Sequence, residues 1–364
     1  MFDCIIVGAG PAGSTAAYHL ALLGRSVVVL EKASLPRNKP CGGGVSPAIA
    51  QWLDFDLTPA ISLKSNKVSY TWKMGDPTQS QVSSPMWMVQ RDIFDDFLIK
   101  QAQKTGAELR DSTEVKGIEF KNFIWEVKTN SEPVYGRYLI AADGAGGPMT
   151  KWLGFKEPKL CISASLETRS IKGDSLNFDF GTIKKGFIWC FPKADGYSFS
   201  IAAMRGDKPK NLKKILTDYA TKCGADVSVS NVREHPLSLW NGDRQLHSQN
   251  ALLVGEAASL ADPLTGEGIR PAIFSGFKAA GAIDRSLSGA ADALEQYTQA
   301  IAAEWGTDMV WAARLAGPFY QFTGSAYRAG VKSQSATQLM GKILCGELRY
   351  ADIANRALKK LMPF

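Results

Sequence analysis

The residues with the clearest chemical role are three glycines and one acid near the N-terminus. Gly8, Gly10 and Gly13 follow a short apolar run in the spacing GxGxxG, and Glu31 ends a second apolar run. In such a turn the first glycine permits the tight bend, and the second lets a pyrophosphate approach the backbone. The third glycine lets helix and strand pack closely, and the acid accepts the ribose hydroxyls. The pattern therefore predicts a dinucleotide site.

The elements around these residues agree with that site. Residues 4–7 and 26–30 are short β-branched runs typical of buried parallel strands, and residues 14–23 are rich in helix formers. Together they form a βαβ unit whose helix N-terminus offers unpaired N–H groups to phosphate. The neighbouring residues are included among the predicted cofactor contacts: Pro11, Ala12, Ser14 and Lys32.

Five later segments decide between FAD and NAD. They are residues 39–44 (KPCGGG), 89–98 with Arg91, 138–144 ending in Asp143-Gly144, 186–193 (GFIWCFPK) and 252–269 with Glu256. With the N-terminal unit, these segments resemble the FAD-dependent geranylgeranyl reductase family, which is itself similar to the aromatic hydroxylases. The resemblance extends over about residues 3–285.

The resemblance implies FAD as the cofactor and assigns roles around it. Glu256 is implied beside the pyrophosphate and ribityl chain, and a helix beginning at Ile269 points its N-terminus at the flavin, where it stabilises negative charge. The further implied contacts are Cys41, Gly42, Gly43, Gly44, Arg91, Val115, Asp143, Gly144, Gly266 and Gly268. Two positions depart from the family: Glu256 replaces the usual Asp, and Ala145 the usual Ser.

A second, mainly antiparallel β-sheet is expected to cover the flavin. Residues 67–73 and 197–203 alternate in polarity, as strands with one buried face do. The sheet then comes from two separated parts of the chain, and a pocket between it and the cofactor domain is expected.

Three aromatic residues and one cysteine are candidates for contact with the substrate. Phe187, Trp189 and Phe191 alternate along one predicted strand and share a face. By the resemblance, that face, with Pro192, lines an isoprenoid tunnel; the residues alone are equally consistent with an aromatic core. Two interpretations also remain for Cys41, namely a proton donor beside the flavin or a small residue in a tight loop.

The expected fold is therefore α/β. A glutathione-reductase-like Rossmann FAD domain is formed by residues 1–60, 86–155 and 250–290. It is interleaved with a mainly antiparallel substrate domain of residues 61–85 and 156–249, and residues 291–364 form a helical C-terminal region. The basic tail of that region, residues 356–361, fits either a capping helix or a helix that rests on an anionic membrane.

Composition narrows the classes of partner. The 364 residues are 45% hydrophobic and carry a net charge of +7, without the long charge runs of nucleic-acid-binding proteins. The six cysteines are scattered and lack metal-ligand spacing, so we expect no metal. The N-terminus has no signal-peptide pattern. We expect a cytoplasmic protein with at most a peripheral contact to a membrane.

These features lead to one leading function and two rivals. With a single GxGxxG, electrons must arrive from a transient donor, either NADPH or a carrier protein such as ferredoxin. The leading hypothesis is an FAD-dependent oxidoreductase that reduces isolated C=C bonds of a geranylgeranyl-type lipid or prenylated molecule. The first rival is an FAD-dependent monooxygenase or halogenase acting on a hydrophobic substrate. The second is a flavin-binding redox sensor or lipid carrier.

Overall fold

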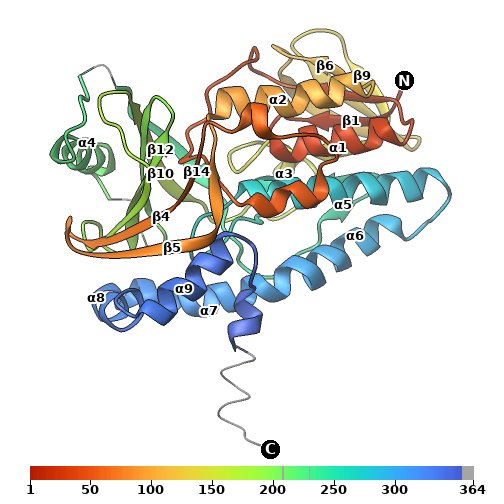
Figure 1. The fold of residues 1–364 in the computed structure, drawn as a ribbon. Coiled ribbons are helices and arrows are strands. Elements are labelled where there is room, and N and C mark those ends of the chain that lie inside the picture. The colour runs from red at the N-terminus through yellow and green to blue at the C-terminus, as the bar shows by residue number, and fades with distance from the viewer. Residues whose placement is uncertain (207–208, 229, 355–364) are drawn as a thin grey trace, which may run out of the picture.

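Two β-sheets organise the chain (Figure 1). The computed structural model describes residues 1–206, 209–228 and 230–354. The first sheet has the order β15-β16-β9-β1-β2-β6, with β7 and β8 joined to it through β9. Its strands are β1 (Phe2–Val7), β2 (Val27–Leu30), β6 (Glu108–Arg110), β7 (Val115–Lys121), β8 (Ile124–Thr129), β9 (Val134–Ala141), β15 (His247–Ser248) and β16 (Ala251–Leu253).

The centre of the first sheet is parallel and covered by helices. Strand β1 pairs in parallel with β2 and β9, and its last four residues are buried, as the apolar run predicts. Helix α1 packs against both α2 and α5 (Figure 1). The helices of this part are α1 (Pro11–Leu22), α2 (Arg91–Lys104), α3 (Met149–Trp152) and α5 (Ile269–Leu287). Short 3₁₀ turns are η1 (Pro47–Trp52), η2 (Thr58–Ala60) and η3 (Gly255–Ala258).

The second sheet has the order β14-β10-β13-β12-β11-β4-β5-β3. All its neighbouring pairs are antiparallel except β11 and β4. Its strands are β3 (Gly44–Val45), β4 (Leu63–Trp72), β5 (Gly75–Met88), β10 (Cys161–Thr168), β11 (Ser175–Phe180), β12 (Gly186–Lys193), β13 (Gly196–Ala203) and β14 (Arg233–Leu237). One face packs on α4 (Leu212–Lys222) through Ile188, Cys190 and Phe199, which leaves the opposite face of β12 to the aromatic residues.

The C-terminal part is helical and lies below the second sheet in Figure 1. It comprises α6 (Ala293–Ile301), α7 (Thr307–Gln321), α8 (Thr323–Ala326) and α9 (Gln334–Leu344), with π-helical turns η4 (Ala302–Gly306) and η5 (Tyr327–Val331). Buried tyrosines tie it to the sheets: Tyr297 Oη donates to Leu253 O at 2.7 Å, and Tyr327 Oη donates to Asp76 O at 2.9 Å. The predicted basic tail, residues 356–361, lies outside the described residues.

The predicted mixed α/β fold with two sheets and a helical C-terminal region is confirmed. Within the described ranges, no helix combines the length and the apolar character required to cross a bilayer.

Candidate cofactor and substrate site

The glycine turn between β1 and α1 places bare backbone at the edge of the first sheet. Gly8 has φ +108°, and a Cβ there would overlap Ala142 O, while a Cβ on Gly13 would overlap Gly8 O. Gly10 differs from both, because the nearest atom to its hypothetical Cβ is Arg37 Nη2 at 3.9 Å. The space beside Gly10 is therefore open to a ligand, and helix α1 begins there without a side-chain cap.

A chain of charges runs from the end of β2 to helix α2. Glu31 Oε2 accepts a hydrogen bond of 3.0 Å from Ala9 N and lies 3.3 Å from Arg37 Nε. Arg37 also contacts Asp95, and Arg91 makes two bonds of 2.7 Å to the same carboxylate. Burial disfavours the charged form of Arg91, but the Asp95 carboxylate outweighs it, so the pKa of Arg91 lies above its ordinary value. Ala33 N also donates to Glu31, at 3.1 Å, so of the roughly four acceptor sites of the carboxylate about one is left for a ribose hydroxyl.

Two adjoining cavities extend from this turn. The first, of about 90 Å³, is lined by the glycine turn, Arg91 and Glu256, whose carboxylate lies 3.3 Å from Lys39 Nζ. The second, of about 100 Å³, is lined by the Cys41–Gly44 loop and the aromatic strand β12. The two cavities share lining residues: Cys41, His235, Leu237, Gly266, Gly268 and Ile269. Helix α5 begins at Ile269 with no side-chain cap, so its N-terminal N–H groups lie at this boundary.

The loop of residues 41–44 is too crowded for side chains on its glycines. A Cβ on Gly42 would overlap the Trp189 indole, and a Cβ on Gly44 would lie 2.7 Å from the Phe191 ring. Gly43 has φ +72°, a conformation that favours glycine. The Cys41 thiol accepts Gly43 N–H at 3.3 Å, and Ser198 Oγ donates to Cys41 O at 3.1 Å. The loop is thus held flat against the second cavity.

Lys193, at the end of β12, holds this loop in place through hydrogen bonds. Its ammonium group donates to Gly42 O and to Val89 O, both at 2.7 Å, and its side chain is buried. Burial lowers the pKa of Lys193 to about 8, although the nearby Cys41 and Glu167 act in the opposite direction. The lysine therefore fixes two carbonyl groups beside the second cavity without contributing a freely hydrated charge.

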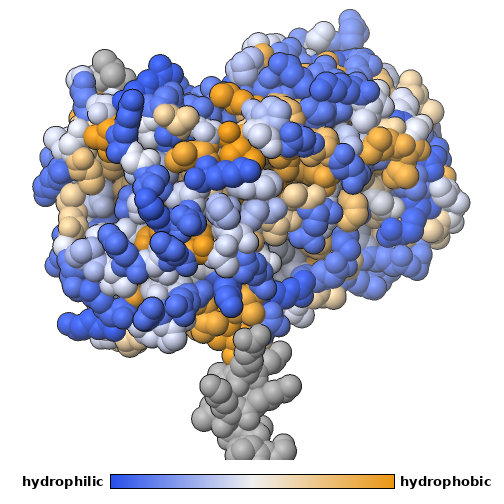
Figure 2. Space-filling view, in the orientation of Figure 1, coloured by the Kyte–Doolittle hydropathy of each residue, from blue (hydrophilic) through white to orange (hydrophobic). Residues whose placement is uncertain are grey.

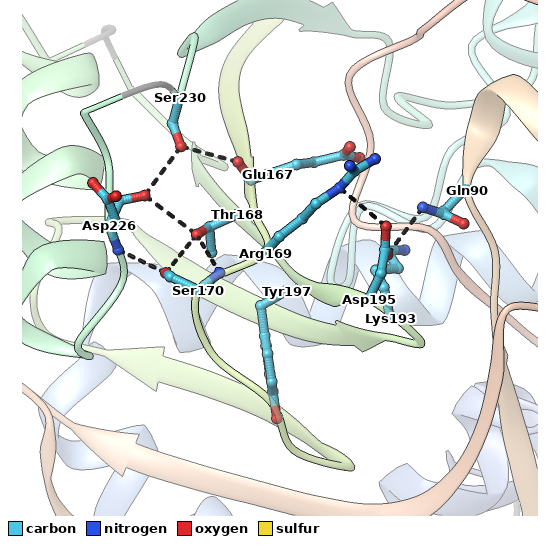
Figure 3. A pocket seen from close by; sticks show the side chains of 10 residues that line it. All are labelled: Gln90, Glu167, Thr168, Arg169, Ser170, Lys193, Asp195, Tyr197, Asp226 and Ser230. Carbon is cyan, nitrogen blue, oxygen red and sulfur yellow. Dashed lines mark hydrogen bonds and ion pairs between the residues drawn. The ribbon is translucent and has the colours of Figure 1, made fainter.

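A further pocket, of about 540 Å³, lies on the other side of Lys193 (Figure 3). Its polar side chains mostly bond to one another: Thr168 Oγ1 pairs with Ser170 Oγ at 2.8 Å, and Arg169 pairs with Asp195 at 3.2 Å. Figure 3 shows Asp226 and Ser230 closing the same network. Because these groups are mutually satisfied, we assign this pocket no part of the cofactor site.

His235 joins the two cofactor cavities from strand β14. Its Nε2 lies 2.7 Å from Ser163 Oγ, and its Nδ1 has no hydrogen-bond partner among the described residues. Burial, followed by the charges of Lys39 and Arg91, lowers the pKa of His235 to about 3. The imidazole is therefore neutral at physiological pH.

A third, apolar cavity lies between the second sheet and the C-terminal helices. It has a volume of about 280 Å³ and is lined largely by aromatic and aliphatic residues of β4, β11, β12, α7 and α9, among them Phe180, Phe187, Phe319 and Met340. Phe178, Thr265 and Leu344 line both this cavity and the one beside the Cys41–Gly44 loop. The apolar cavity therefore adjoins the cavity beside the Cys41–Gly44 loop.

The predicted residues fall into two sets. Those that line the cofactor cavities are Gly10, Pro11, Ala12, Cys41, Gly42, Gly43, Gly44, Arg91, Gly144, Glu256, Gly266, Gly268 and Ile269. Gly8, Gly13 and Ser14 shape the turn, Ser14 through a bond from its Oγ to Ala9 O. Of the aromatic candidates, Phe187 lines the apolar cavity, and Trp189 and Phe191 line the second cofactor cavity.

Four further predicted residues are not among the lining of the cofactor cavities. Pro192 occupies the alternate position of β12 and lines none of these cavities, because successive side chains of a strand face opposite sides. The Asp143 carboxylate accepts Met149 N at 2.9 Å, so it supports the start of α3, and burial raises its pKa to about 6. Lys32 is exposed, and Val115 begins β7 two residues after Thr113, whose N–H donates to Glu31 O.

Sequence reasoning missed Arg37, Lys39, Lys193 and His235. Lys39 and Lys193 stand at the ends of segments already singled out, so their position was a usable signal. Arg37 and His235 carried no local signal, because their partners Asp95 and Ser163 lie 58 and 72 residues away in the chain.

The residues present fit FAD. The open backbone at Gly10 and the N-terminus of α1 match the pyrophosphate, and the Glu31 carboxylate matches the ribose. The N-terminus of α5 and the flat Cys41–Gly44 loop match the flavin. The two adjoining cavities extend from the glycine turn to the Cys41–Gly44 loop, which are the two places where the pyrophosphate and the flavin would lie.

Comparison with known proteins agrees with this fit. The model of a family described as FAD binding domain matches residues 1–304. An uncharacterized protein of Methanosarcina barkeri is 34% identical over 298 residues, which are 79% of this chain and 75% of that protein. A digeranylgeranylglycerophospholipid reductase of Methanococcus vannielii is 27% identical over 316 residues, 79% of this chain and 78% of that enzyme.

A solved structure gives the same picture for the fold. A geranylgeranyl bacteriochlorophyll reductase-like protein of Thermoplasma acidophilum superposes with a TM-score of 0.78 at 22% identity, covering 94% of this chain and 91% of that one. The expected resemblance is thus confirmed: the chain belongs to the FAD binding domain family, and proteins named as geranylgeranyl-type reductases are among those it resembles.

Proposed function

We propose that this protein reduces isolated C=C bonds in the prenyl chain of a lipid or prenylated molecule. The observation that carries the proposal is the apolar cavity of about 280 Å³ that adjoins the cofactor site through Phe178, Thr265 and Leu344. A hydrocarbon chain in that cavity would reach the Cys41–Gly44 loop without crossing a polar barrier. The relatives named as digeranylgeranylglycerophospholipid reductases support the same class of substrate.

The residues of the chain align the substrate with the cofactor and exclude water from the site. Reduced FAD, when bound, supplies the hydride. Trp189 and Phe191 press on the glycines of the loop and fix its distance from the substrate space. An isolated alkene offers no carbonyl to accept charge, so close alignment in a water-free cavity must provide much of the barrier reduction.

Two side chains are able to hold the proton that completes the reduction. The Cys41 thiol lines both cofactor cavities. Glu267 lines the second, and burial raises its pKa to about 7 although Arg270 opposes the shift, so the acid form is populated at neutral pH. We propose Cys41 as the donor, because it stands on the loop that faces the cofactor.

The electron donor is proposed to bind only transiently. The chain has one GxGxxG turn, and it serves FAD. Either NADPH or a small carrier protein such as ferredoxin is consistent with that arrangement.

An anaerobic experiment tests the reaction. The purified flavoprotein is reduced with dithionite, geranylgeranyl-bearing lipid is added, and flavin reoxidation is followed together with the mass of the product. Reoxidation with a gain of two hydrogens per turnover is expected. A flavin that stays reduced until air is admitted, and then forms an oxygen adduct, would favour the monooxygenase or halogenase reaction instead.

Trp189→Ala tests the substrate space itself. The indole lines the second cavity and is only partly buried, so its loss should leave FAD bound while turnover or the distribution of products changes. Trp189→Phe is the matched control and should retain most of the activity. Unchanged kinetics in the alanine variant would remove Trp189 from the substrate site, and loss of folding would assign it to the core.

A further inference from the structure

The chain between residues 309 and 346 has an unusual balance of charge. It contains four basic residues, Arg314, Arg328, Lys332 and Lys342, and no Asp or Glu. These residues belong to α7, α8, η5 and α9 and the segments that join them. Lys332 pairs with Asp76, whereas Arg314, Arg328 and Lys342 are exposed and form no ion pair within the described residues. Glu347, directly after this stretch, interacts electrostatically with Lys342, so Arg314 and Arg328 are the exposed cations without a carboxylate partner among the described residues.

The same stretch also exposes large apolar side chains. Leu315 and Phe319 are spaced at i and i+4 near the end of α7, so they form one stripe, and Phe322 follows directly after the helix as its C-cap residue. Phe322 is 65% exposed and Leu315 is 47% exposed. Figure 2 shows one hydrophobic patch at the lower edge of the view, next to mostly hydrophilic surface over α8. Such side chains are costly to leave in water unless something covers them.

The exposed stripe continues into the apolar cavity. Leu315 and Phe319 line that cavity, so the exposed side of Leu315 stands at its opening. Gly330 and Val331 of the π-helical turn η5 line the cavity close to the exposed Arg328. The opening is therefore bordered by apolar and basic groups together, which is the combination that binds at the interface of an anionic bilayer.

We propose that the α7–α9 face docks on an anionic lipid bilayer and that a membrane lipid enters the apolar cavity directly from it. The entry route rests on the proposed function, because it requires a lipid substrate. The docking does not, because it follows from the exposed Phe322 and the exposed cations Arg314 and Arg328. Direct entry spares the prenyl chain a passage through water.

Vesicle sedimentation of the full-length FAD-loaded protein tests the docking. We expect binding to vesicles of phosphatidylcholine with phosphatidylglycerol, and much weaker binding to phosphatidylcholine alone, with a loss at high salt. Phe322→Ser should lower the partition coefficient about tenfold, as removal of one inserted aromatic side chain does. Arg328→Glu should weaken binding to the anionic vesicles and leave the neutral ones unaffected.

Phe123→Ser is the matched control. Phe123 is 79% exposed in the turn between β7 and β8, and its loss should leave vesicle binding unchanged. All variants keep the basic tail, so a difference between them reports on the α7–α9 face alone. Absence of binding by the wild type, or equal binding by the Phe322→Ser and Phe123→Ser variants, would overturn the proposal.

A second readout separates docking from chemistry. With a short water-soluble prenyl substrate, Phe322→Ser should reoxidise the reduced flavin as fast as wild type, because Phe322 does not line the cavities described above. With vesicle-embedded lipid, the same variant should be slower. If no substrate reoxidises the flavin, the proposed function fails while the sedimentation result still decides the docking.

Discussion

The cofactor half of the site and the sheet above it are built by different means. In the cofactor half, backbone does the binding: Gly8 and Gly13 pack against other backbone, and Gly10 leaves an open approach. Above it, side chains from distant strands meet, as when Trp189 lies on Gly42 or Lys193 donates to Val89 O across 104 residues of sequence. Backbone recognition suits a cofactor that never changes, whereas a side-chain surface can be reshaped for different substrates.

The prediction with the largest expected effect compares two glycines of the cofactor half, Gly13, which packs against backbone, and Gly10, which leaves space for the cofactor. Gly13→Ala places a Cβ on Gly8 O, so the turn must open; we expect a loss of upward of about 3 kcal/mol in unfolding free energy and no retained FAD. Gly10→Ala meets no protein atom closer than 3.9 Å and has extended φ and ψ, so the apoprotein should keep its stability. Its FAD affinity should nevertheless fall at least about tenfold, or about 1.4 kcal/mol.

Thermal unfolding of the apoproteins and FAD titration check this pair. Gly117→Ala is the control, because Gly117 has no positive φ and no atom within 4 Å of its Cβ position. Normal FAD binding by Gly10→Ala would contradict the assignment of the open backbone to the pyrophosphate.

The same contrast explains what sequence could predict. The turn, Glu31 and the helices beside them were predictable because the pattern that forms them lies within 31 consecutive residues. Alternation along β12 correctly placed Phe187, Trp189 and Phe191 on one face. The role of Lys193 was not predictable, since it depends on the approach of Gly42 and Val89, and His235 depends on the pairing of β14 with β10. Contacts made by tertiary pairing leave no periodic trace in the sequence.

The second prediction concerns Asp95, where the two kinds of construction meet. Asp95 is fully buried between Arg91 and Arg37, and Arg37 continues to Glu31. Asp95→Asn leaves a buried guanidinium without its counter-charge, so unfolding free energy should fall by about 3 kcal/mol. Asp96→Asn is the control, because its partner Lys100 is exposed, and should cost about 0.5 kcal/mol or less. Urea denaturation measures both, and equal losses would show that the Arg91–Asp95–Arg37 cluster adds little.

The prediction with the smallest expected effect tests whether Lys193 carries a buried positive charge. The unfolded chain keeps the lysine proton to about pH 10.4, whereas in the folded protein burial lowers the pKa of Lys193 to about 8. Between these values the unfolded state binds more protons, so Lys193 makes stability rise with pH, by about 1 kcal/mol per unit. Lys193→Met should remove that rise and also shift the absorption of bound flavin, because Gly42 O and Val89 O lose their donor. Lys172→Met, at an exposed lysine, should keep the wild-type slope between pH 8 and 9.5 in urea denaturation. If Lys193→Met keeps that slope as well, another group titrates, and the sheet holds the Cys41–Gly44 loop without the help of a buried charge.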